Sequence, residues 1–178
     1  MPCYNFEKYI YQCLTSLATQ TLSVPYEIIV ADDCSTDNSI NEIRKAKLEY
    51  PNLITIISFS KNQGGNEARD AAINKARGEY IGYLDGDDIA YPNRMQKLYD
   101  FLKDNQDCIL AYHDVEHIDE QGIPLNNTYF NNFYNQQYIP EKAGMEHLVK
   151  FGTFIPAAGL MLKKKAHQNG LLPKEIKH

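Results

Sequence analysis

Short runs of apolar residues alternate along the chain with stretches in which apolar residues recur every three or four positions. Such short runs are typical of strands buried on both faces, and the periodic stretches are typical of amphipathic helices. The pattern predicts strands over residues 26–31, 53–59, 79–84 and 108–113. It predicts helices over residues 6–20, from the capping residues 35–37 to Pro51, between Gly65 and Gly78, and from Pro92 to Leu102.

This order of elements predicts an α/β fold. Strand–helix–strand units of this length favour a mostly parallel sheet with helices on both faces. No repeat, linker or low-complexity tract divides the 178 residues, so we expect a single domain. Ligands of such sheets bind beyond the carboxyl ends of the strands, and the sequence places aspartates directly after two predicted strands.

The pattern weakens toward the end of the chain. Gln121 and Gly122 indicate a turn, and residues 125–138, rich in Asn, Gln and aromatic residues, show no clear period. We interpret residues 125–138 as a loop or lid that contributes acceptor contacts. A short helix over residues 141–151 and a last strand over residues 158–162 are expected to follow.

Composition and charge argue against some classes of function and favour others. A net charge of −5 is opposed to nucleic-acid binding, which needs a basic surface. The four cysteines include no Cys-x-x-Cys pair, which favours reduced thiols and a cytoplasmic location. No signal peptide or membrane-length apolar run occurs in the sequence, so any attachment to the inner face of the membrane would come through regions outside these residues.

The acidic loop, residues 85–88 (Asp-Gly-Asp-Asp), follows the predicted strand 79–84. Three carboxylates this close repel one another unless a cation or hydrogen-bond donors neutralise them. Carboxylate oxygens suit Mn²⁺ or Mg²⁺, and Mg²⁺ typically combines one or two carboxylates with phosphate oxygens. The alternative is an acidic turn in which Asp87 or Asp88 caps the next helix. The position at a strand end favours the metal interpretation.

The first acidic pair, Asp32 and Asp33, follows the predicted strand 26–31. These carboxylates can accept hydrogen bonds from a base N–H or from ribose hydroxyl groups. Helix capping is the alternative, but residues 35–37 already supply capping side chains. The pair therefore favours a ligand.

Three further residues are candidates for donor contacts. Tyr4, two residues after Pro2, is placed to stack on a nucleobase, although packing is an equal alternative. Gly64 and the glycine after it precede a helix N-terminus, which favours phosphate but is a weak signal alone. Arg69 in that helix is able either to reach a ligand or to pair with a carboxylate.

Taken together, these segments resemble family 2 glycosyltransferases of the GT-A, Rossmann-like fold. The resemblance rests on four motifs in the same order as in the family: residues 2–5, 27–37, 62–69 and 78–88. It implies transfer of a sugar from a nucleoside diphosphate donor, which we expect to be a UDP-sugar, to a hydroxyl of a saccharide or lipid-linked saccharide, usually with inversion. A metal would stabilise the leaving diphosphate, and a carboxylate base would deprotonate the acceptor.

The resemblance also implies residue roles. Pro2 belongs to the donor-binding segment, Tyr4 and Asp33 would contact the base with Asp32 beside them, and Arg69 would lie near the base. In the acidic loop, Asp85 and Gly86 would approach the ribose or diphosphate, and Asp87 would bind the metal.

Two departures from the family matter. The usual apolar first strand before Pro2 is lacking, which would leave open hydrogen-bonding edges inside the sheet. The acidic catalytic base is expected beyond His178, so no base is assigned, and Asp114 is a poor substitute. We therefore expect a partial glycosyltransferase domain over residues 1–178. A non-catalytic nucleotide-sugar-binding module is the alternative; a sugar nucleotidyltransferase would need a Gly-rich phosphate loop that residues 3–7 do not form.

Overall fold

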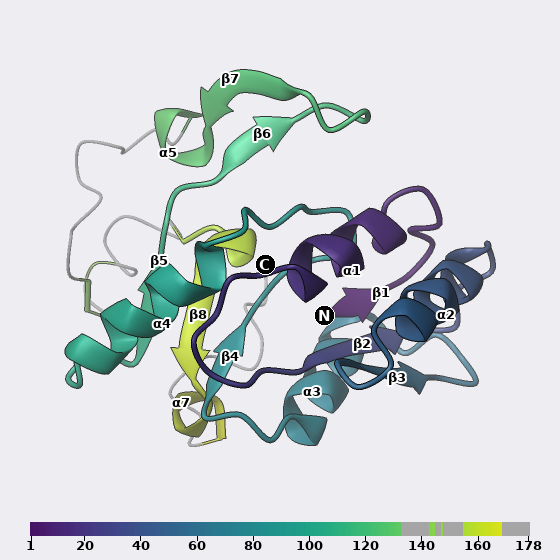
Figure 1. Cartoon of the computed structure of the whole chain (residues 1–178), viewed down its shortest axis with the longest axis horizontal. Coiled ribbons are helices and arrows are strands. Elements are labelled where there is room, and N and C mark those ends of the chain that lie inside the picture. The colour runs from purple at the N-terminus through teal and green to yellow at the C-terminus, as the bar shows by residue number, and fades with distance from the viewer. Residues whose placement is uncertain (133–142, 145–146, 148–154, 169–178) are drawn as a thin grey trace.

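The computed structural model describes residues 1–132, 143–144, 147 and 155–168, and Figure 1 shows how its elements are arranged. The first half forms three parallel strands in the order β1 (Pro2–Cys3), β2 (Ile28–Asp32) and β3 (Ile54–Ser58). The helices α1 (Ile10–Ala18), α2 (Ser39–Glu49) and α3 (Gly65–Lys75) alternate with these strands. Across the described residues, no helix combines the length and apolar character needed to span a bilayer.

Strand β2 carries the core of this half, because its residues are buried on both faces of the sheet. Ile28 and Val30 pack with apolar side chains of α1 and α2, whereas Ile29 and Ala31 pack against α3. Alternate residues of a strand point to opposite faces, so helices cover both sides of this sheet. The predicted α/β arrangement is confirmed here.

The second sheet has the order β4 (Tyr80–Gly82), β8 (Leu160–Lys163) and β5 (Leu110–Tyr112). Helix α4 (Arg94–Asp104) packs on it through Leu98 and Leu102. The predicted strand near residues 158–162 is confirmed as β8, which follows the 3₁₀ turn η2 (Ala157–Gly159) and precedes α7 (Lys164–Gln168). β8 runs antiparallel to both neighbours, so this sheet is not parallel as expected. Parallel neighbours need a crossover connection, which is usually a helix. β8 comes from far along the chain and can therefore pair antiparallel with both neighbours.

A hairpin of β6 (Glu116–Ile118) and β7 (Pro124–Thr128), followed by α5 (Tyr129–Asn132), projects from the second sheet (Figure 1). The predicted turn is confirmed: Gly122 has φ +79°, and the Asp119 carboxylate accepts hydrogen bonds from two turn amides. The prediction of a loop was wrong for residues 125–132, because β7 is largely exposed and shows no alternation. Residues 133–138 and most of the predicted helix 141–151 lie outside the described residues.

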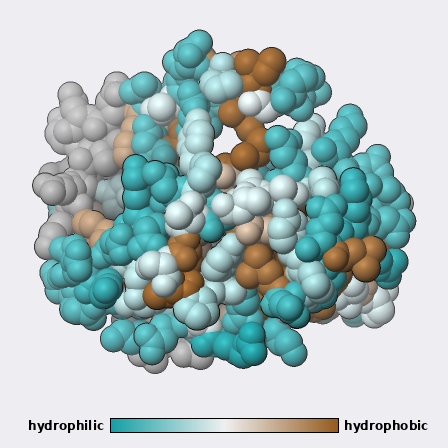
Figure 2. Space-filling model, in the orientation of Figure 1, coloured by the Kyte–Doolittle hydropathy of each residue, from teal (hydrophilic) through white to brown (hydrophobic). Residues whose placement is uncertain are grey.

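Apolar surface on this hairpin comes from exposed side chains near its turn. Ile123 is 60% exposed and Leu125 is 51% exposed. Figure 2 shows an apolar patch on the projecting hairpin, separated from the other apolar patches of this face by polar surface. The hairpin also contacts the residues that follow Asp88: the Tyr91 hydroxyl donates to the Glu116 carboxylate, and a Cβ at Gly122 would lie 3.6 Å from Ile89 Cδ1.

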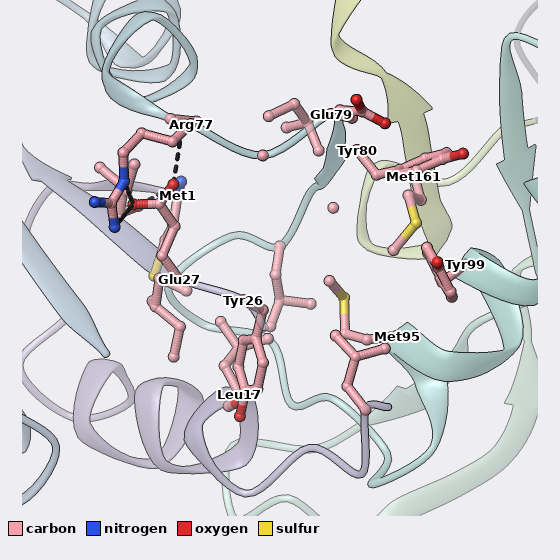
Figure 3. A pocket seen from close by; sticks show the side chains of 18 of the residues that line it. Met1, Leu17, Tyr26, Glu27, Arg77, Glu79, Tyr80, Met95, Tyr99 and Met161 are labelled. Atoms are coloured by element: carbon pink, nitrogen blue, oxygen red, sulfur yellow. Dashed lines mark hydrogen bonds and ion pairs between the residues drawn. The ribbon is translucent and has the colours of Figure 1, made fainter. Parts of the chain in front are cut away.

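Where the family's usual first strand is expected, the structure has the short strand β1 and, next to it, a cavity. β1 is present but only two residues long, and it pairs with β2 at Ala31 and Asp32 alone. Within the described chain, the remaining edge of β2 and the outer edge of β4 have no strand partner. A cavity of about 410 Å³ lies between them (Figure 3), lined by residues such as Ile29 and Gly82. The open edges that the resemblance implied are therefore present.

Candidate functional site

Asp33 is a buried anchor between two loops. It is 1% exposed, and its two carboxylate oxygens accept hydrogen bonds from the backbone N–H groups of Gln63 and Gly64, both at 2.7 Å. These bonds hold the turn that leads into α3, where Gly64 adopts φ +97°. Each carboxylate oxygen keeps a further lone pair, so a ligand bond is compatible with this arrangement.

Asp32 lies beside Asp33 but has few partners of its own. It is 4% exposed, and its Oδ2 accepts only a long hydrogen bond, 3.4 Å, from the Ser35 N–H. Its Oδ1 is buried and has no hydrogen-bond partner among the described residues. A buried carboxylate oxygen without a donor is costly, so Asp32 offers an acceptor that a ligand can satisfy.

The segment around Tyr4 is tied to the loop that follows β2. The Asn5 N–H donates to Ser35 Oγ at 3.1 Å, and Asn5 Oδ1 accepts from the Thr36 N–H at 2.8 Å. Asn5 and Cys34 both have positive φ, 59° and 62°, a conformation that Asn tolerates better than most residues. The two loops therefore hold each other and leave the Tyr4 side chain 43% exposed, which suits a stacking surface.

The turn before the first helix is also held by side chains near the start of α2. The predicted helix over residues 6–20 begins only at Ile10, because residues 6–9 form a turn. The Phe6 N–H donates to Ser39 Oγ at 2.7 Å, and the Glu7 N–H donates to the Asp37 carboxylate at 3.1 Å. Asp37 also accepts from the Ser39 N–H at the start of α2, although the N-cap of this helix is Asn38 and makes no side-chain cap bond, so the prediction of capping by residues 35–37 holds only for this one contact.

The acidic loop presents its carboxylates without internal partners. Asp85 is half-buried and Asp87 is exposed. In the described part of the chain neither carboxylate accepts a hydrogen bond. The N-cap of α4 is Asn93, so neither Asp87 nor Asp88 caps the next helix. Asp88 bonds the loop through its backbone, its N–H donating to the Asp85 carbonyl at 3.2 Å.

Gly86 allows this loop to approach the N-terminal segment closely. A Cβ at position 86 would lie 2.7 Å from Phe6 Cδ2 and 3.1 Å from Ile10 Cδ1. The Cys13 thiol donates to the Asp85 carbonyl at 3.3 Å, and Ser16 Oγ accepts from the Ala90 N–H at 3.0 Å. The acidic loop is thus packed against α1 and the turn before it, and only a glycine fits at its centre.

The carboxylates of the acidic loop repel one another, which affects the pKa of Asp88. Burial, together with repulsion from Asp87 and Asp85, raises the pKa of Asp88 to about 6. Beneath it, Arg94 is 6% exposed; burial lowers the pKa of its guanidinium to about 10, and Asp88 opposes that shift. Arg94 therefore stays positive at neutral pH, below a loop that a further cation would stabilise.

Arg69 lies close to the end of β4. Its guanidinium is 5.9 Å from the centroid of the Tyr83 ring, and its Nη1 donates to Asn66 Oδ1 at 3.0 Å. Its Nε is buried without a partner, and no ion pair of the described residues includes it. Pairing with a carboxylate, one of the two alternatives for Arg69, is therefore not seen.

The Met1 amino group shows that the two acidic segments are neighbours. It donates to the Ile29 carbonyl at 3.0 Å, and burial lowers its pKa to about 6. Asp85 raises that pKa and Arg69 lowers it, so both lie near the start of β1. Pro2 is in β1 itself, which pairs with the end of β2 where Asp32 lies. The sequence-predicted residues are thus gathered around β1 and the ends of β2 and β4.

The residues present fit a metal that a diphosphate helps to hold. No three His, Cys, Asp or Glu side chains of the described residues are arranged as a ready-made metal site. Mg²⁺, in contrast to Zn²⁺ or Ca²⁺, commonly uses one or two carboxylates and takes its other ligands from phosphate and water. The unpartnered carboxylates of Asp85 and Asp87 match that donor set. The cavity in Figure 3 is a different place, since none of the eight predicted site residues lines it.

Two residues outside the predicted set change the description of the site. Asp114 uses its Oδ1 to accept from the Val115 and Phe130 N–H groups, both at 2.9 Å, so its role is structural. Arg94 was missed, although its spacing carried a signal: it shares the buried face of α4 with Leu98 and Leu102. A charged residue in an apolar stripe must find polar partners inside the protein.

Comparison with known proteins agrees with this architecture. The model of "Glycosyl transferase family 2" matches residues 1–168. A relative from Bacillus spizizenii, "Poly(ribitol-phosphate) beta-glucosyltransferase", is 39% identical over 126 residues, which are 70% of this chain and 20% of that protein. A second relative, "Chondroitin synthase" from Escherichia coli, is 29% identical over 85% of this chain and 22% of its own length. The chain thus spans about a fifth of the length of these two relatives.

Solved structures show the same fold. Residues 1–349 of TarS from S. aureus superpose on 99% of this chain and 50% of that chain, with a TM-score of 0.70 and 24% identity. TarS 1–349 in complex with UDP-GlcNAc matches 59% of this chain and 30% of that chain, with 32% identity and a TM-score of 0.52. A mannosyltransferase from Pyrobaculum calidifontis, in complex with GDP-Man and Mn²⁺, covers 98% of this chain and 46% of that chain at 17% identity and a TM-score of 0.70.

The fold and the paired acidic strand ends define a glycosyltransferase domain of the GT-A type. This chain belongs to glycosyl transferase family 2, as the match over residues 1–168 shows. The predicted resemblance is confirmed at the level of family and fold.

Proposed function

We propose that this domain binds a nucleoside diphosphate sugar, with UDP as the nucleotide, for transfer of the sugar to an acceptor hydroxyl. The observation that carries the proposal is the pairing of two unsatisfied acidic groups: Asp32 with a buried free oxygen, and Asp85 with Asp87 free of hydrogen bonds in the described chain. The UDP-GlcNAc complex of TarS, at 32% identity, supports a UDP-sugar as donor.

Each side chain has a proposed task. Tyr4 stacks on the base, Asp33 and Asp32 accept hydrogen bonds from the nucleoside, and Arg69 lies alongside. Asp85 and the backbone at Gly86 approach the ribose and diphosphate. Asp87, the exposed carboxylate, holds Mn²⁺ or Mg²⁺ together with the diphosphate oxygens. When bound, the metal neutralises the charge that develops on the leaving diphosphate.

The acceptor and the course of the reaction are proposed from the family. We propose a saccharide or lipid-linked saccharide as acceptor, transfer with inversion, and a cytoplasmic reaction. Asp114 is engaged by two backbone N–H groups, so we do not propose it as the base, and we assign no base among the described residues.

Calorimetric titration with UDP tests the donor site directly. We expect binding in the presence of Mn²⁺ that weakens by at least about tenfold when the metal is chelated. Mn²⁺ without UDP should bind weakly, because the chain supplies too few ligands alone. Tight UDP binding that chelation leaves unchanged would contradict the role of Asp87. A thermal-shift series with UDP-, GDP- and TDP-sugars would identify which nucleobase the donor site prefers.

Turnover separates an enzyme from a binding module. The alternative function is a nucleotide-sugar-binding module without catalysis, and the absence of an assigned base among the described residues favours it for the isolated domain. Sugar transfer or donor hydrolysis by the isolated chain would exclude that alternative. Binding without turnover is the expected result for residues 1–178.

A further inference from the structure

Arg94 ties the strand that carries the acidic loop to a segment more than sixty residues away in sequence. Its Nη2 donates to the Tyr83 carbonyl at 2.7 Å and to the Leu160 carbonyl at 3.3 Å, and its Nε donates to the Ala158 carbonyl at 3.0 Å. Tyr83 is two residues before Asp85. A planar guanidinium suits this task, because its N–H groups point outward in a fixed fork.

The loop is held on its other side by uncharged groups. Gln20 uses its side-chain amide to donate to the Tyr91 carbonyl at 2.8 Å and to accept from the Met95 N–H at 3.0 Å. Together with the Cys13 and Ser16 contacts, these bonds fix residues 85–91 against α1. Only Arg94 connects the β4 end of the loop with η2 and β8 through a side chain, among the hydrogen bonds of the described residues.

The position of Arg94 also has a cost that calls for an explanation. A buried cation beneath three carboxylates opposes the binding of a metal ion by charge alone. Exposed lysines on the same helix, such as Lys97, would give solubility without this cost. Asp88 stabilises the charge of Arg94, and the guanidinium adds a fixed fork of donors that a lysine does not have.

We propose that Arg94 is a positioning residue of the donor–metal site. The backbone already joins β4 to β8, with the Tyr83 N–H donating to the Leu160 carbonyl at 3.0 Å, and the three bonds from the Arg94 side chain to backbone carbonyls hold the start of the acidic loop against η2 and β8 in addition. The proposal rests on the proposed function for its effect on the metal, and on the fold alone for its effect on the loop. Arg94 touches neither donor nor metal in this scheme. It acts through the backbone that carries Asp85 and Asp87.

The test compares Arg94→Met and Arg94→Lys with Lys97→Met. Arg94→Met removes the bonds at similar size, Arg94→Lys keeps the charge but not the fork, and Lys97→Met is a matched loss of charge on an exposed position of the same helix. Calorimetry measures UDP binding with and without Mn²⁺. Hydrogen exchange measures protection of the Tyr83 and Asp88 amides, which does not depend on any ligand.

We expect both Arg94 variants to lose affinity for UDP with Mn²⁺ by about tenfold, with metal-free UDP binding within about twofold of the original. The amides of Tyr83 and Asp88 should exchange at least about tenfold faster, while those of β2 keep their protection. Lys97→Met should change neither property.

Four results would overturn the proposal. Unchanged metal-dependent binding in Arg94→Met would show that the Arg94 bonds do not act on the site, and tighter binding would show that only its charge does. Original affinity in Arg94→Lys would show that the guanidinium fork is not needed. Faster exchange spread evenly over β2 and β4 would show a general loss of stability. If the unaltered chain does not bind UDP, the proposed function fails, and the exchange of Tyr83 and Asp88 still decides the role of Arg94.

Discussion

The two acidic segments follow their strands in the same way, yet the structure uses them differently. Asp33 is buried and both of its oxygens are bonded to backbone N–H groups of the turn before α3. Asp87 is exposed, and within the described chain its carboxylate has no hydrogen bond. One carboxylate is part of the scaffold, and the other is available to a ligand. An aspartate after a strand therefore does not have a single meaning.

The difference arises from what each loop contributes. The turn at Gly64 brings two N–H groups to one carboxylate, and such charge-assisted bonds are about twice as strong as neutral ones. The acidic loop brings three carboxylates together, and burial with mutual repulsion raises the pKa of Asp88 to about 6. The first segment is stable without a ligand, whereas the second is stabilised when a cation arrives.

Removal of the Asp33 carboxylate should have the largest effect on stability. In Asp33→Ala, the N–H groups of Gln63 and Gly64 lose their acceptor, and we expect the free energy of unfolding to fall by about 3 kcal/mol. Urea denaturation followed by circular dichroism measures this change. Asp104→Ala, at an exposed position, is the control and should stay within about 0.5 kcal/mol. A loss below about 1 kcal/mol for Asp33→Ala would remove its role as an anchor.

Replacement of Asp87 should affect binding and leave the fold intact. Asp87→Asn keeps the shape of the side chain but removes its charge, so we expect UDP affinity with Mn²⁺ to fall by about 100-fold. The free energy of unfolding should change by no more than about 0.5 kcal/mol, because no internal bond is lost. Calorimetry and urea denaturation on the same sample give both numbers. Equal losses in Asp87→Asn and the control Asp104→Asn would show that Asp87 is not the metal ligand.

Gly86 packs the acidic loop against α1 and the turn before it, and a larger side chain should disturb that contact. Gly86→Ala places a methyl group 2.7 Å from Phe6 Cδ2, and we expect a loss of about 2 kcal/mol in the free energy of unfolding. Phe6→Leu in the same chain should recover part of that loss, since the two sites touch. Gly65→Ala is the control, because nothing lies within 4 Å of a Cβ there. Thermal and urea unfolding of these three variants test this; an unaffected Gly86→Ala chain would rule out the close packing.

Sequence reasoning reached the family and the strand ends, because these depend on local pattern, and the roles of the eight candidate residues stay predictions. The run before Asp32 is apolar enough to require burial, and the carboxylates after it stand out for that reason. The pairing of β8 between β4 and β5 was not accessible, since no local pattern encodes which distant strand inserts. The hairpin strand β7 was missed because exposed strands have no apolar alternation.

The different roles of the carboxylates within the site could not be predicted either, because they depend on contacts between distant residues. The local sequence around Asp33 does not indicate that the Gln63 and Gly64 N–H groups donate to its carboxylate, because these residues are about thirty positions away. Arg94 could have been suspected, since it occupies the apolar face of α4. Its carbonyl partners at positions 158 and 160 could not, because they depend on where β8 packs.

Asp32 gives the smallest expected effect and the sharpest test of the comparison, because it sits beside the anchor Asp33 yet has a free oxygen. In Asp32→Asn the unpartnered Oδ1 loses its charge, so stability should stay within about 0.5 kcal/mol. UDP affinity should fall by about tenfold, the value of one hydrogen bond to a charged acceptor. Calorimetry with uridine alone, beside UDP, places the contact on the nucleoside if both affinities fall together. A stability loss as large as that of Asp33→Ala, with unchanged nucleotide binding, would make the whole first pair part of the scaffold and leave ligand contact to the acidic loop.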